Sequence, residues 1–185
     1  MKIFREIKWF FNTKKLRNLK LLALDIDGVL TDGSLFYDPK GTIIKNFNVK
    51  DGLGLKLLQS NQIQIALISG GKSGASDARA RDLNIDYCLT GIKDKLSTLS
   101  TLQSNLNIST QNTIFVGDDL NDLALKERVS LLICPRDSSK GLIRKASLVL
   151  NSDGGKGAIR ELAERILIAK GIWNQYLKNG WNNLN

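Results

Sequence analysis

Residues 20–33 read KLLALDIDGVLTDG, and this stretch decides the fold. An apolar run leads directly into two aspartates, Asp25 and Asp27, and glycines follow at once. Such a run is typical of a buried strand, and a lone Asp at its end is usually a turn former. A pair is different, because two like charges so close repel each other and favour a bound cation or a shared proton. The stretch therefore predicts a buried strand that ends in either a turn or an acidic site.

The rest of the chain alternates continuous apolar runs with amphipathic segments. We expect a β-hairpin over 34–48, further strands at 63–69, 85–90, 112–118, 129–135 and 147–150, and helices at 51–61, 73–84, 93–107, 119–128, 138–146 and 157–169. This order predicts a doubly wound, Rossmann-like α/β domain, in which helices cover both faces of a parallel sheet. In such sheets the ligand lies outside the carboxyl ends of the strands.

The amino-acid composition excludes several kinds of catalytic mechanism. The 185 residues are 42% hydrophobic and 24% charged, as in an ordinary single globular domain, and no run approaches a membrane-spanning length. There is no histidine, which excludes Ser-His-Asp and Cys-His mechanisms and leaves acid–base work to carboxylates or lysines. Cys88 and Cys134 both lie in apolar runs, which is typical of reduced core thiols in a cytoplasmic protein.

The first twenty residues carry +6 of the net charge of +9, with seven basic residues against Glu6. MKIFREIKWFFNTKK has apolar residues at helical spacing, and Lys8 interrupts them in a way that a signal peptide does not. We expect this basic amphipathic helix to pack on its own domain or on a sister subunit. Contact with an anionic membrane is an alternative, and no nucleic-acid partner is expected.

Polar residues gather where four predicted strands end or the next helix begins. They are Asp25 and Asp27; Ser69, Gly70 and Gly71; Lys95; and Asp118, Asp119, Asn121 and Asp122. Each piece has an ordinary structural explanation as a turn, loop, solvated lysine or helix cap, but the ordered combination is much rarer. In a doubly wound sheet all of them converge on one edge, where clustered carboxylates suit Mg²⁺.

Such a set can transfer a phosphoryl group. One carboxylate attacks phosphorus to form an aspartyl-phosphate, and the second protonates the leaving oxygen and then activates water. Ser69 and the amides after it can hold phosphate oxygens, while Lys95 neutralises charge on the nucleophile and the transferring group.

DIDGVLTDG, ISG, KDKL and GDDLNDL resemble the four motifs of haloacid dehalogenase-superfamily phosphatases. FNVKDGLG at 47–54 and GGKGAIRE at 154–161 resemble segments of a capless subgroup, the 3-deoxy-D-manno-octulosonate 8-phosphate (Kdo8P) phosphatases. The resemblance covers residues 18–172. It divides the chain into a basic extension at 1–17, a phosphatase domain at 18–172 and an Asn-rich tail at 173–185.

The resemblance implies that Asp25 is the nucleophile and a metal ligand. Asp27 would be the general acid and base and would bind Mg²⁺ through its backbone carbonyl, and Asp118 would be the third ligand. Ser69 would bind the phosphoryl group, and Lys95 would neutralise the charge of the nucleophile and of the phosphoryl group.

The resemblance also implies supporting and substrate-binding residues. Asp119 and Asp122 would support the metal, and substrate contacts would come from Asp27, Asn48, Val49, Lys50, Asp51, Gly52, Lys56, Gly70, Arg79, Lys95 and Asn121. For Asp51, capping of the following helix is an equal alternative. The implied reaction is hydrolysis of a phosphorylated sugar acid.

Two positions depart from the family pattern. Gly71 stands where the family usually has Arg, and Lys56 where it often has Arg. Because Arg binds a carboxylate bidentately and Lys does not, the departures concern recognition of the sugar acid rather than the phosphoryl chemistry. A related phosphatase acting on a nonulosonate 9-phosphate is therefore an alternative.

The spacing of the motifs leaves no room for a cap domain. Asp25 and Ser69 are 44 positions apart, and Ser69 and Lys95 are 26 apart. An open site tolerates water poorly, and the resemblance implies a homotetramer in which the 34–48 hairpin shapes a neighbour's site.

Two other classes of protein, a phosphate-accepting receiver and a non-catalytic binding protein, are alternatives to a phosphatase. A response-regulator receiver also gathers acids, a hydroxyl and a lysine around Mg²⁺, but it lacks the second acid of the D-x-D pair. A catalytically silent binding protein would have no chemical need for Asp27.

Overall fold

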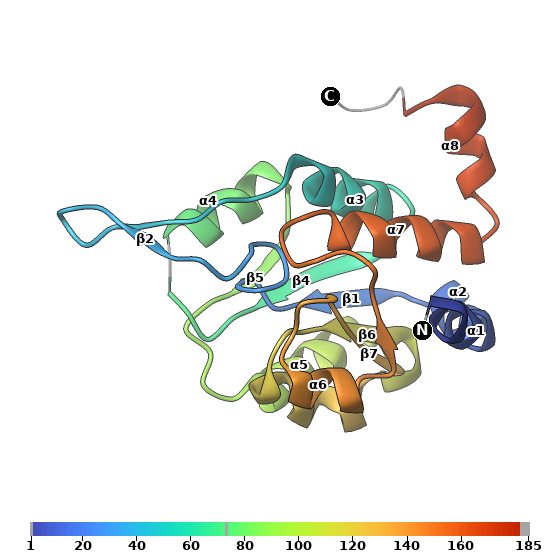
Figure 1. Ribbon diagram of the computed structural model, residues 1–185, viewed down its shortest axis with the longest axis horizontal. Coiled ribbons are helices and arrows are strands. Elements are labelled where there is room, and N and C mark those ends of the chain that lie inside the picture. The colour runs from blue at the N-terminus through green and yellow to red at the C-terminus, as the bar shows by residue number, and fades with distance from the viewer. Residues whose placement is uncertain (1, 73, 182–185) are drawn as a thin grey trace.

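The computed structural model describes residues 2–72 and 74–181. A six-stranded parallel sheet forms its centre, in the order β5-β4-β1-β6-β7-β8 (Figure 1). Its strands are β1 (Leu21–Leu24), β4 (Gln64–Ile68), β5 (Tyr87–Leu89), β6 (Thr113–Val116), β7 (Leu131–Cys134) and β8 (Leu148–Val149). Strand β1 lies between β4 and β6, and Leu24 aligns with Leu67 on one side and Val116 on the other. The predicted doubly wound parallel sheet is confirmed.

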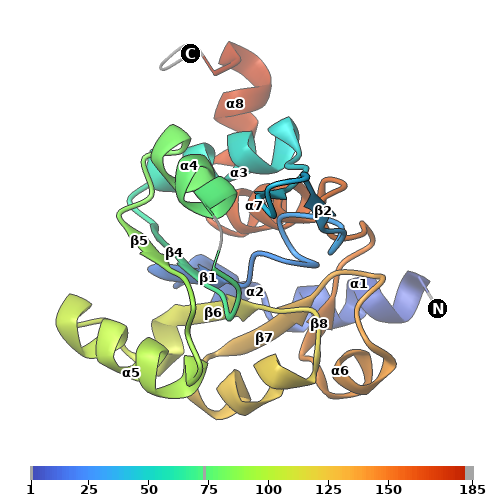
Figure 2. The same cartoon turned by 90° about the vertical axis from the view of Figure 1, so that its left-hand side faces the viewer.

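Helices cover both faces of the sheet (Figures 1 and 2). On one side lie α3 (Val49–Gln59), α4 (Gly74–Asp82) and α7 (Ala158–Ala169), and on the other lie α5 (Lys95–Leu106), the 3₁₀ helix η2 (Leu120–Arg128) and α6 (Lys140–Lys145). Strand β1 is buried on both faces because its side chains alternate: Leu22 and Leu24 join the first core, Leu21 and Ala23 the second.

The remaining elements lie at the periphery. They are α1 (Lys2–Phe11), α2 (Thr13–Arg17), η1 (Thr110–Asn112), α8 (Trp173–Asn179) and the hairpin strands β2 (Phe36–Tyr37) and β3 (Ile43–Ile44). The hairpin projects from the body at the edge opposite α1 and α2 (Figure 1). Within the described residues no helix is long and apolar enough to cross a membrane.

Two elements differ from the sequence-based expectation. The hairpin pairs only two residues on each side, Phe36 with Ile44 and Tyr37 with Ile43. The segment predicted as a helix at 119–128 is a 3₁₀ helix, whose first turn is tightened by Asp119 and Asp122. The side chain of Asp122 turns back to accept a hydrogen bond from the backbone N–H of Asp118 at 3.0 Å, and this contact draws the turn towards the end of β6.

The segment before α7 packs directly on the loop that follows β1. A Cβ at Gly154 would lie 2.0 Å from the carbonyl oxygen of Gly28, and the backbone N–H of Gly155 donates to the Val29 carbonyl at 3.0 Å. Gly28 itself has φ +78°, and a Cβ there would lie 2.1 Å from a carboxylate oxygen of Asp118. Glycine at these positions thus lets three segments distant in sequence meet around the ends of β1 and β6.

Candidate active site

A buried ion cluster lies beneath the carboxyl ends of β1 and β6. The ammonium of Lys95, on the first turn of α5, donates to Asp25 and, at 2.6 Å, to Oδ1 of Asp122. All three residues are buried. Burial opposes the charge of the ammonium, but the two carboxylates outweigh it and raise the pKa of Lys95 above its usual value. For Asp25, burial outweighs the attraction of Lys95 and raises the pKa of its carboxyl.

Asp118 adds a third carboxylate to the cluster. One carboxylate oxygen from each of Asp25, Asp118 and Asp122 lies within 4.8 Å of the other two. Burial, followed by the charges of Asp25, Asp122 and Asp119, raises the pKa of Asp118 to about 7. Three carboxylates face a single ammonium, so the cluster carries an excess of negative charge that fits a hard divalent cation.

Of the three clustered carboxylates, those of Asp25 and Asp118 can be reached by a metal ion from the strand-end pocket. Both line a pocket of about 310 Å³ at the strand ends. Asp122 is 0% exposed and is not among the residues that line this pocket. Mg²⁺ entering from this pocket would therefore be held by Asp25 and Asp118, with Asp122 behind them as support. The family resemblance implies the same roles for Asp25, Asp118 and Asp122, with the backbone carbonyl of Asp27 as a further ligand, and these roles stay a prediction.

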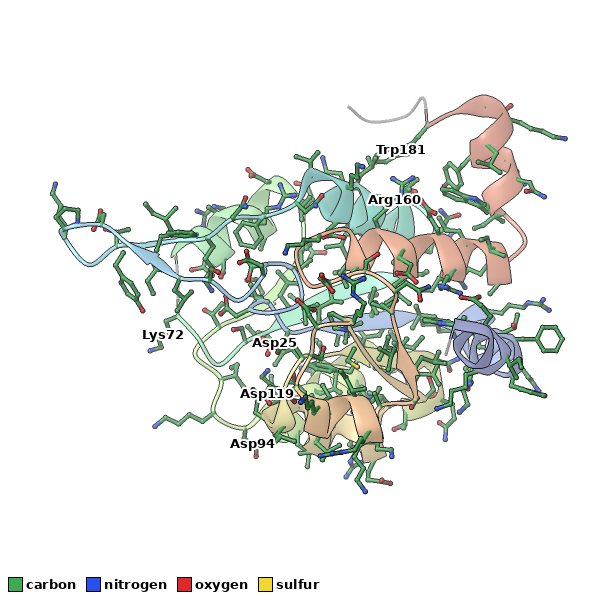
Figure 3. The ribbon with its side chains drawn as sticks, viewed as in Figure 1. Asp25, Lys72, Asp94, Asp119, Arg160 and Trp181 are labelled. Carbon is green, nitrogen blue, oxygen red and sulfur yellow. The ribbon has the colours of Figure 1, made fainter. Side chains whose placement is uncertain are left out.

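The pocket gathers most of the residues predicted from the four motifs. Its lining is formed by Asp25, Asp27, Gly28, Gly33, Ser69, Gly70, Gly71, Asp118, Asp119 and Asn121. Figure 3 places Asp25 and Asp119 at this end of the sheet, and Lys72 further out toward the hairpin. The Ser69 hydroxyl accepts a hydrogen bond from the N–H of Gly71 at 3.2 Å, which orients it at the end of β4.

Sequence reasoning missed Lys45, which follows β3 in the hairpin. Its ammonium lies 2.7 Å from Oδ1 and 2.8 Å from Oδ2 of Asp27 and donates to the hydroxyl of Ser76 at 3.2 Å. The Lys45 side chain is only 2% exposed, whereas that of Asp27 is 32% exposed. The hairpin thus positions the second carboxylate of the D-x-D pair. The only sequence signal was a lysine just before FNVKDGLG, and lysine in an exposed hairpin is usually solvated.

Four predicted substrate-binding residues line a second pocket of about 300 Å³. They are Val49, Gly52, Lys56 and Arg79, beside Leu53, Leu83 and Trp181, between α3, α4 and the end of the chain. Trp181 lies next to α3 in Figure 3. The two pockets share no lining residue, and contact of this second group with substrate stays a prediction.

Two other predicted residues have side chains with structural contacts. Asn48 caps α3 by accepting from the N–H of Lys50 at 2.8 Å. Asp51 is 1% exposed and accepts from the backbone N–H groups of Gly157 and Arg160 at 3.1 and 2.9 Å. Asp51 therefore anchors the start of α7 to α3 rather than capping its own helix, and burial raises its pKa.

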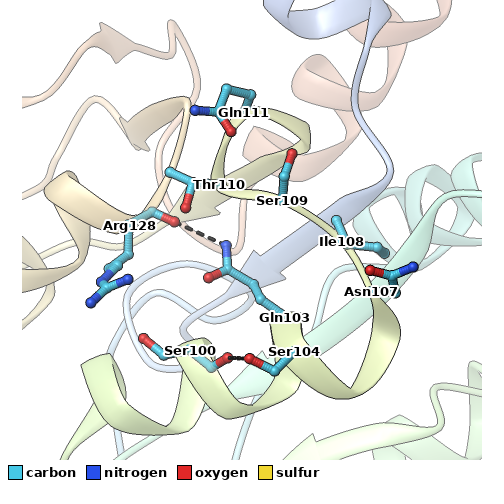
Figure 4. Close-up of a pocket in the computed structure, with 9 residues that line it drawn as sticks. All are labelled: Ser100, Gln103, Ser104, Asn107, Ile108, Ser109, Thr110, Gln111 and Arg128. Atoms are coloured by element: carbon cyan, nitrogen blue, oxygen red, sulfur yellow. Dashed lines mark hydrogen bonds between the residues drawn. The ribbon is translucent and has the colours of Figure 1, made fainter.

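A larger hollow, about 430 Å³, lies at the opposite end of the sheet (Figure 4). Its lining is polar but largely uncharged, and Gln103 crosses it to donate to the carbonyl oxygen of Arg128 at 3.0 Å. The hollow contains no carboxylate or nucleophilic pair comparable to that at the strand ends, so size alone does not mark the site.

The fold and the acidic cluster together define a haloacid dehalogenase-like hydrolase, and residues 89–162 match the family model of that description. The 3-deoxy-D-manno-octulosonate 8-phosphate phosphatase of Escherichia coli K12 is 38% identical over 157 residues, which cover 85% of this chain and 84% of that protein. The chain belongs to the 3-deoxy-D-manno-octulosonate 8-phosphate phosphatase family.

Solved structures of similar proteins support this family assignment. The enzyme of that name from Moraxella catarrhalis, in complex with magnesium, phosphate and KDO, matches with a TM-score of 0.88 and 34% identity, over 91% of this chain and 97% of the other. The cobalt-bound Haemophilus influenzae phosphatase matches with a TM-score of 0.84 and 36% identity, over 88% and 95%. Both neighbours carry a divalent metal, as the acidic cluster of this chain requires.

The raised pKa of Asp118 predicts how pH and Mg²⁺ affect stability. Its folded value of about 7 exceeds the ordinary value of 3.8, so the folded chain binds this proton more tightly than the unfolded chain. Its contribution to stability is complete below the ordinary value and is lost as the pH rises through about 7. In metal-free protein we therefore expect the melting temperature of Asp118→Asn, relative to that of the parent, to rise between pH 5 and pH 8.

Mg²⁺ competes with the same proton, so the melting temperature of the parent should rise more on adding Mg²⁺ at pH 8 than at pH 5. Differential scanning fluorimetry with EDTA or Mg²⁺ measures both effects. Asp82→Asn, which removes an exposed carboxylate on α4, is the matched control. An equal Mg²⁺ shift in Asp118→Asn and the parent would rule out Asp118 as a ligand.

Proposed function

We propose that this chain is a Mg²⁺-dependent phosphatase that hydrolyses 3-deoxy-D-manno-octulosonate 8-phosphate to Kdo and phosphate through an aspartyl-phosphate. The observation that carries the proposal is the buried carboxylate of Asp25, bound to Lys95 at the floor of the strand-end pocket. Family membership supports the substrate, since the curated relative bears that activity in its name and the Moraxella catarrhalis structure contains magnesium, phosphate and KDO.

In the first step the Asp25 carboxylate attacks phosphorus. The bond between phosphorus and the sugar oxygen breaks, and that oxygen takes a proton from Asp27. Lys95 favours the charged form of Asp25 and orients its carboxylate, because the ammonium is fixed between Asp25 and Asp122. Ser69 and the N–H groups after it are placed to receive phosphoryl oxygens at the end of β4.

In the second step water attacks the phosphorus of the aspartyl-phosphate. The deprotonated Asp27 takes the proton of this water, and the bond to Asp25 breaks to release phosphate. Mg²⁺, held by Asp25, Asp118 and the backbone carbonyl of Asp27, would supply positive charge to the phosphoryl oxygens. Lys45 orients Asp27 for both proton transfers, since it contacts both carboxylate oxygens.

The substrate's own carboxylate needs a cationic partner. Lys56 and Arg79 line the second pocket and are our candidates for the carboxylate end of the sugar acid. Gly71 has no side chain that could bind the substrate's carboxylate. A Cβ at this position would lie 3.3 Å from a carboxylate oxygen of Asp27, so residue 71 lies beside the proposed general acid.

We also propose that the protein is a cytoplasmic homotetramer. The hairpin exposes large apolar side chains, with Phe36 at 57%, Tyr37 at 64% and Ile44 at 55%, which a neighbouring subunit would cover. The reduced thiols Cys88 and Cys134 suit a reducing compartment.

Substrate identity is tested with phosphate release by purified protein in Mg²⁺, across 3-deoxy-D-manno-octulosonate 8-phosphate, nonulosonate 9-phosphates and common sugar phosphates. We expect preference for the first, lost in Asp25→Asn. Preference for a nonulosonate 9-phosphate would keep the mechanism and overturn the substrate. No release by a folded, Mg²⁺-loaded sample would overturn the activity itself.

Lys45→Met should lower kcat about 10- to 100-fold with a smaller change in KM, because the Asp27 carboxylate loses the group that orients it. Lys45→Arg should recover part of the loss by restoring the charge. Lys40→Met, at the exposed hairpin tip, is the matched control. Parent-like kcat in Lys45→Met would show that the hairpin lysine does not act through Asp27.

Oligomeric state is measured by size-exclusion chromatography with light scattering. We expect about four times the chain mass of 20.5 kDa, and a smaller species for the double variant Phe36→Ser/Tyr37→Ser. A parent protein that runs as a monomer at micromolar concentration would contradict the tetramer.

A further inference from the structure

Helix α1 exposes three large apolar side chains. Phe10 and Phe11 are each 77% exposed and Ile7 is 45% exposed, whereas Trp9 is 4% exposed and belongs to the core. An amphipathic helix on a globular domain normally does the reverse and buries its apolar stripe. Three large side chains on one helix thus face solvent with no packing role in the domain that carries them.

This orientation is fixed by specific contacts. The guanidinium of Arg165, on α7, lies 4.4 Å from the centre of the Trp9 ring. The same guanidinium donates to both carboxylate oxygens of Glu6, at 2.7 and 3.0 Å. Trp9 and Glu6 therefore hold α1 against α7, while Ile7, Phe10 and Phe11 stay exposed.

The surroundings of the exposed apolar residues are basic. Lys8 is exposed on α1, Lys14, Lys15 and Arg17 are exposed on α2, and Lys20 is exposed just beyond. Glu6, the single acidic residue among the first twenty, is paired with Arg165. The outer surface of this segment thus combines bulky apolar side chains with a local excess of positive charge.

The position of the segment leaves the active site open. Helices α1 and α2 lie at the end of the sheet where β1 begins, and Asp25 lies at the other end (Figures 1 and 3). A flat surface that covers α1 would not cover the strand-end pocket.

We propose that α1 and α2 dock the protein on an anionic lipid surface. Phe10, Phe11 and Ile7 would enter the boundary between headgroups and acyl chains, while the lysines contact anionic headgroups. A second copy of this face would bring like charges together, since residues 1–20 carry +6. A nucleic-acid duplex would match the charge but offers no apolar surface to Ile7, Phe10 and Phe11. Of these three occupants, the lipid surface satisfies both features.

The test is co-sedimentation of the full chain with vesicles of phosphatidylglycerol and phosphatidylcholine, compared with vesicles of phosphatidylcholine alone. We expect binding to the anionic vesicles that weakens with salt. The bound fraction should fall about tenfold in Phe10→Ser/Phe11→Ser and in Lys14→Glu/Lys15→Glu, because apolar and charged contacts act together. Leu177→Ser and Lys178→Glu, on exposed α8, are matched controls that should bind like the parent.

Three results would overturn the proposal. The first is no binding to anionic vesicles by the folded parent protein. The second is parent-like binding by Phe10→Ser/Phe11→Ser. The third is a loss of oligomer mass in that variant, measured by light scattering, which would assign the face to contact between copies. Circular dichroism and melting temperature establish that each variant is folded, and because neither readout uses catalysis, failure here leaves the proposed phosphatase activity untouched.

Discussion

The buried ion cluster of Lys95, Asp25 and Asp122 is the constraint on which the site depends. A single buried ammonium binds two carboxylates that arise from different strands, at the ends of β1 and β6. Removing one partner of such a cluster would leave an uncompensated buried charge, which costs several kcal/mol, about 3–5 in measured cases. The cluster therefore links β1, α5 and η2 through one buried ammonium. With Asp118, the cluster also holds more carboxylates than ammonium groups, and this excess of negative charge favours the binding of Mg²⁺.

Close backbone packing is the second condition. A Cβ at Gly117 would lie 2.2 Å from a carboxylate oxygen of Asp122, and one at Gly28 would lie 2.1 Å from Asp118. Any side chain at either position would overlap the neighbouring carboxylate. The acidic cluster therefore needs glycine at both positions. The glycines of DIDGVLTDG and VGDDLND thus serve the cluster as much as the turns in which they lie.

The sequence predicted the sheet, the order of its elements and the meeting of the four motifs, because each rests on local pattern: apolar runs of strand length, and polar residues where those runs end. It did not predict contacts that depend on how distant segments face each other. Lys45 meets Asp27 because the chain passes beside Asp27 as it returns from the hairpin, and Asp51 reaches α7 rather than its own helix start. Helical spacing likewise identified the apolar stripe of α1 but not the side that it faces, which Trp9 and Arg165 determine.

The two aspartates of the D-x-D pair sit in unlike environments, and this contrast supports their division of labour. Asp25 is buried, with its carboxylate held by Lys95, so it has one fixed direction of attack. The Asp27 side chain is 32% exposed and lines the pocket, so it can meet both a leaving oxygen and a water molecule. A chain with no histidine must obtain its proton carrier from a carboxylate, and two carboxylates can play different roles only when their surroundings differ. One strand end supplies both surroundings, because Asp25 meets Lys95 from α5, while Asp27, two positions further along the chain, meets Lys45 from the hairpin.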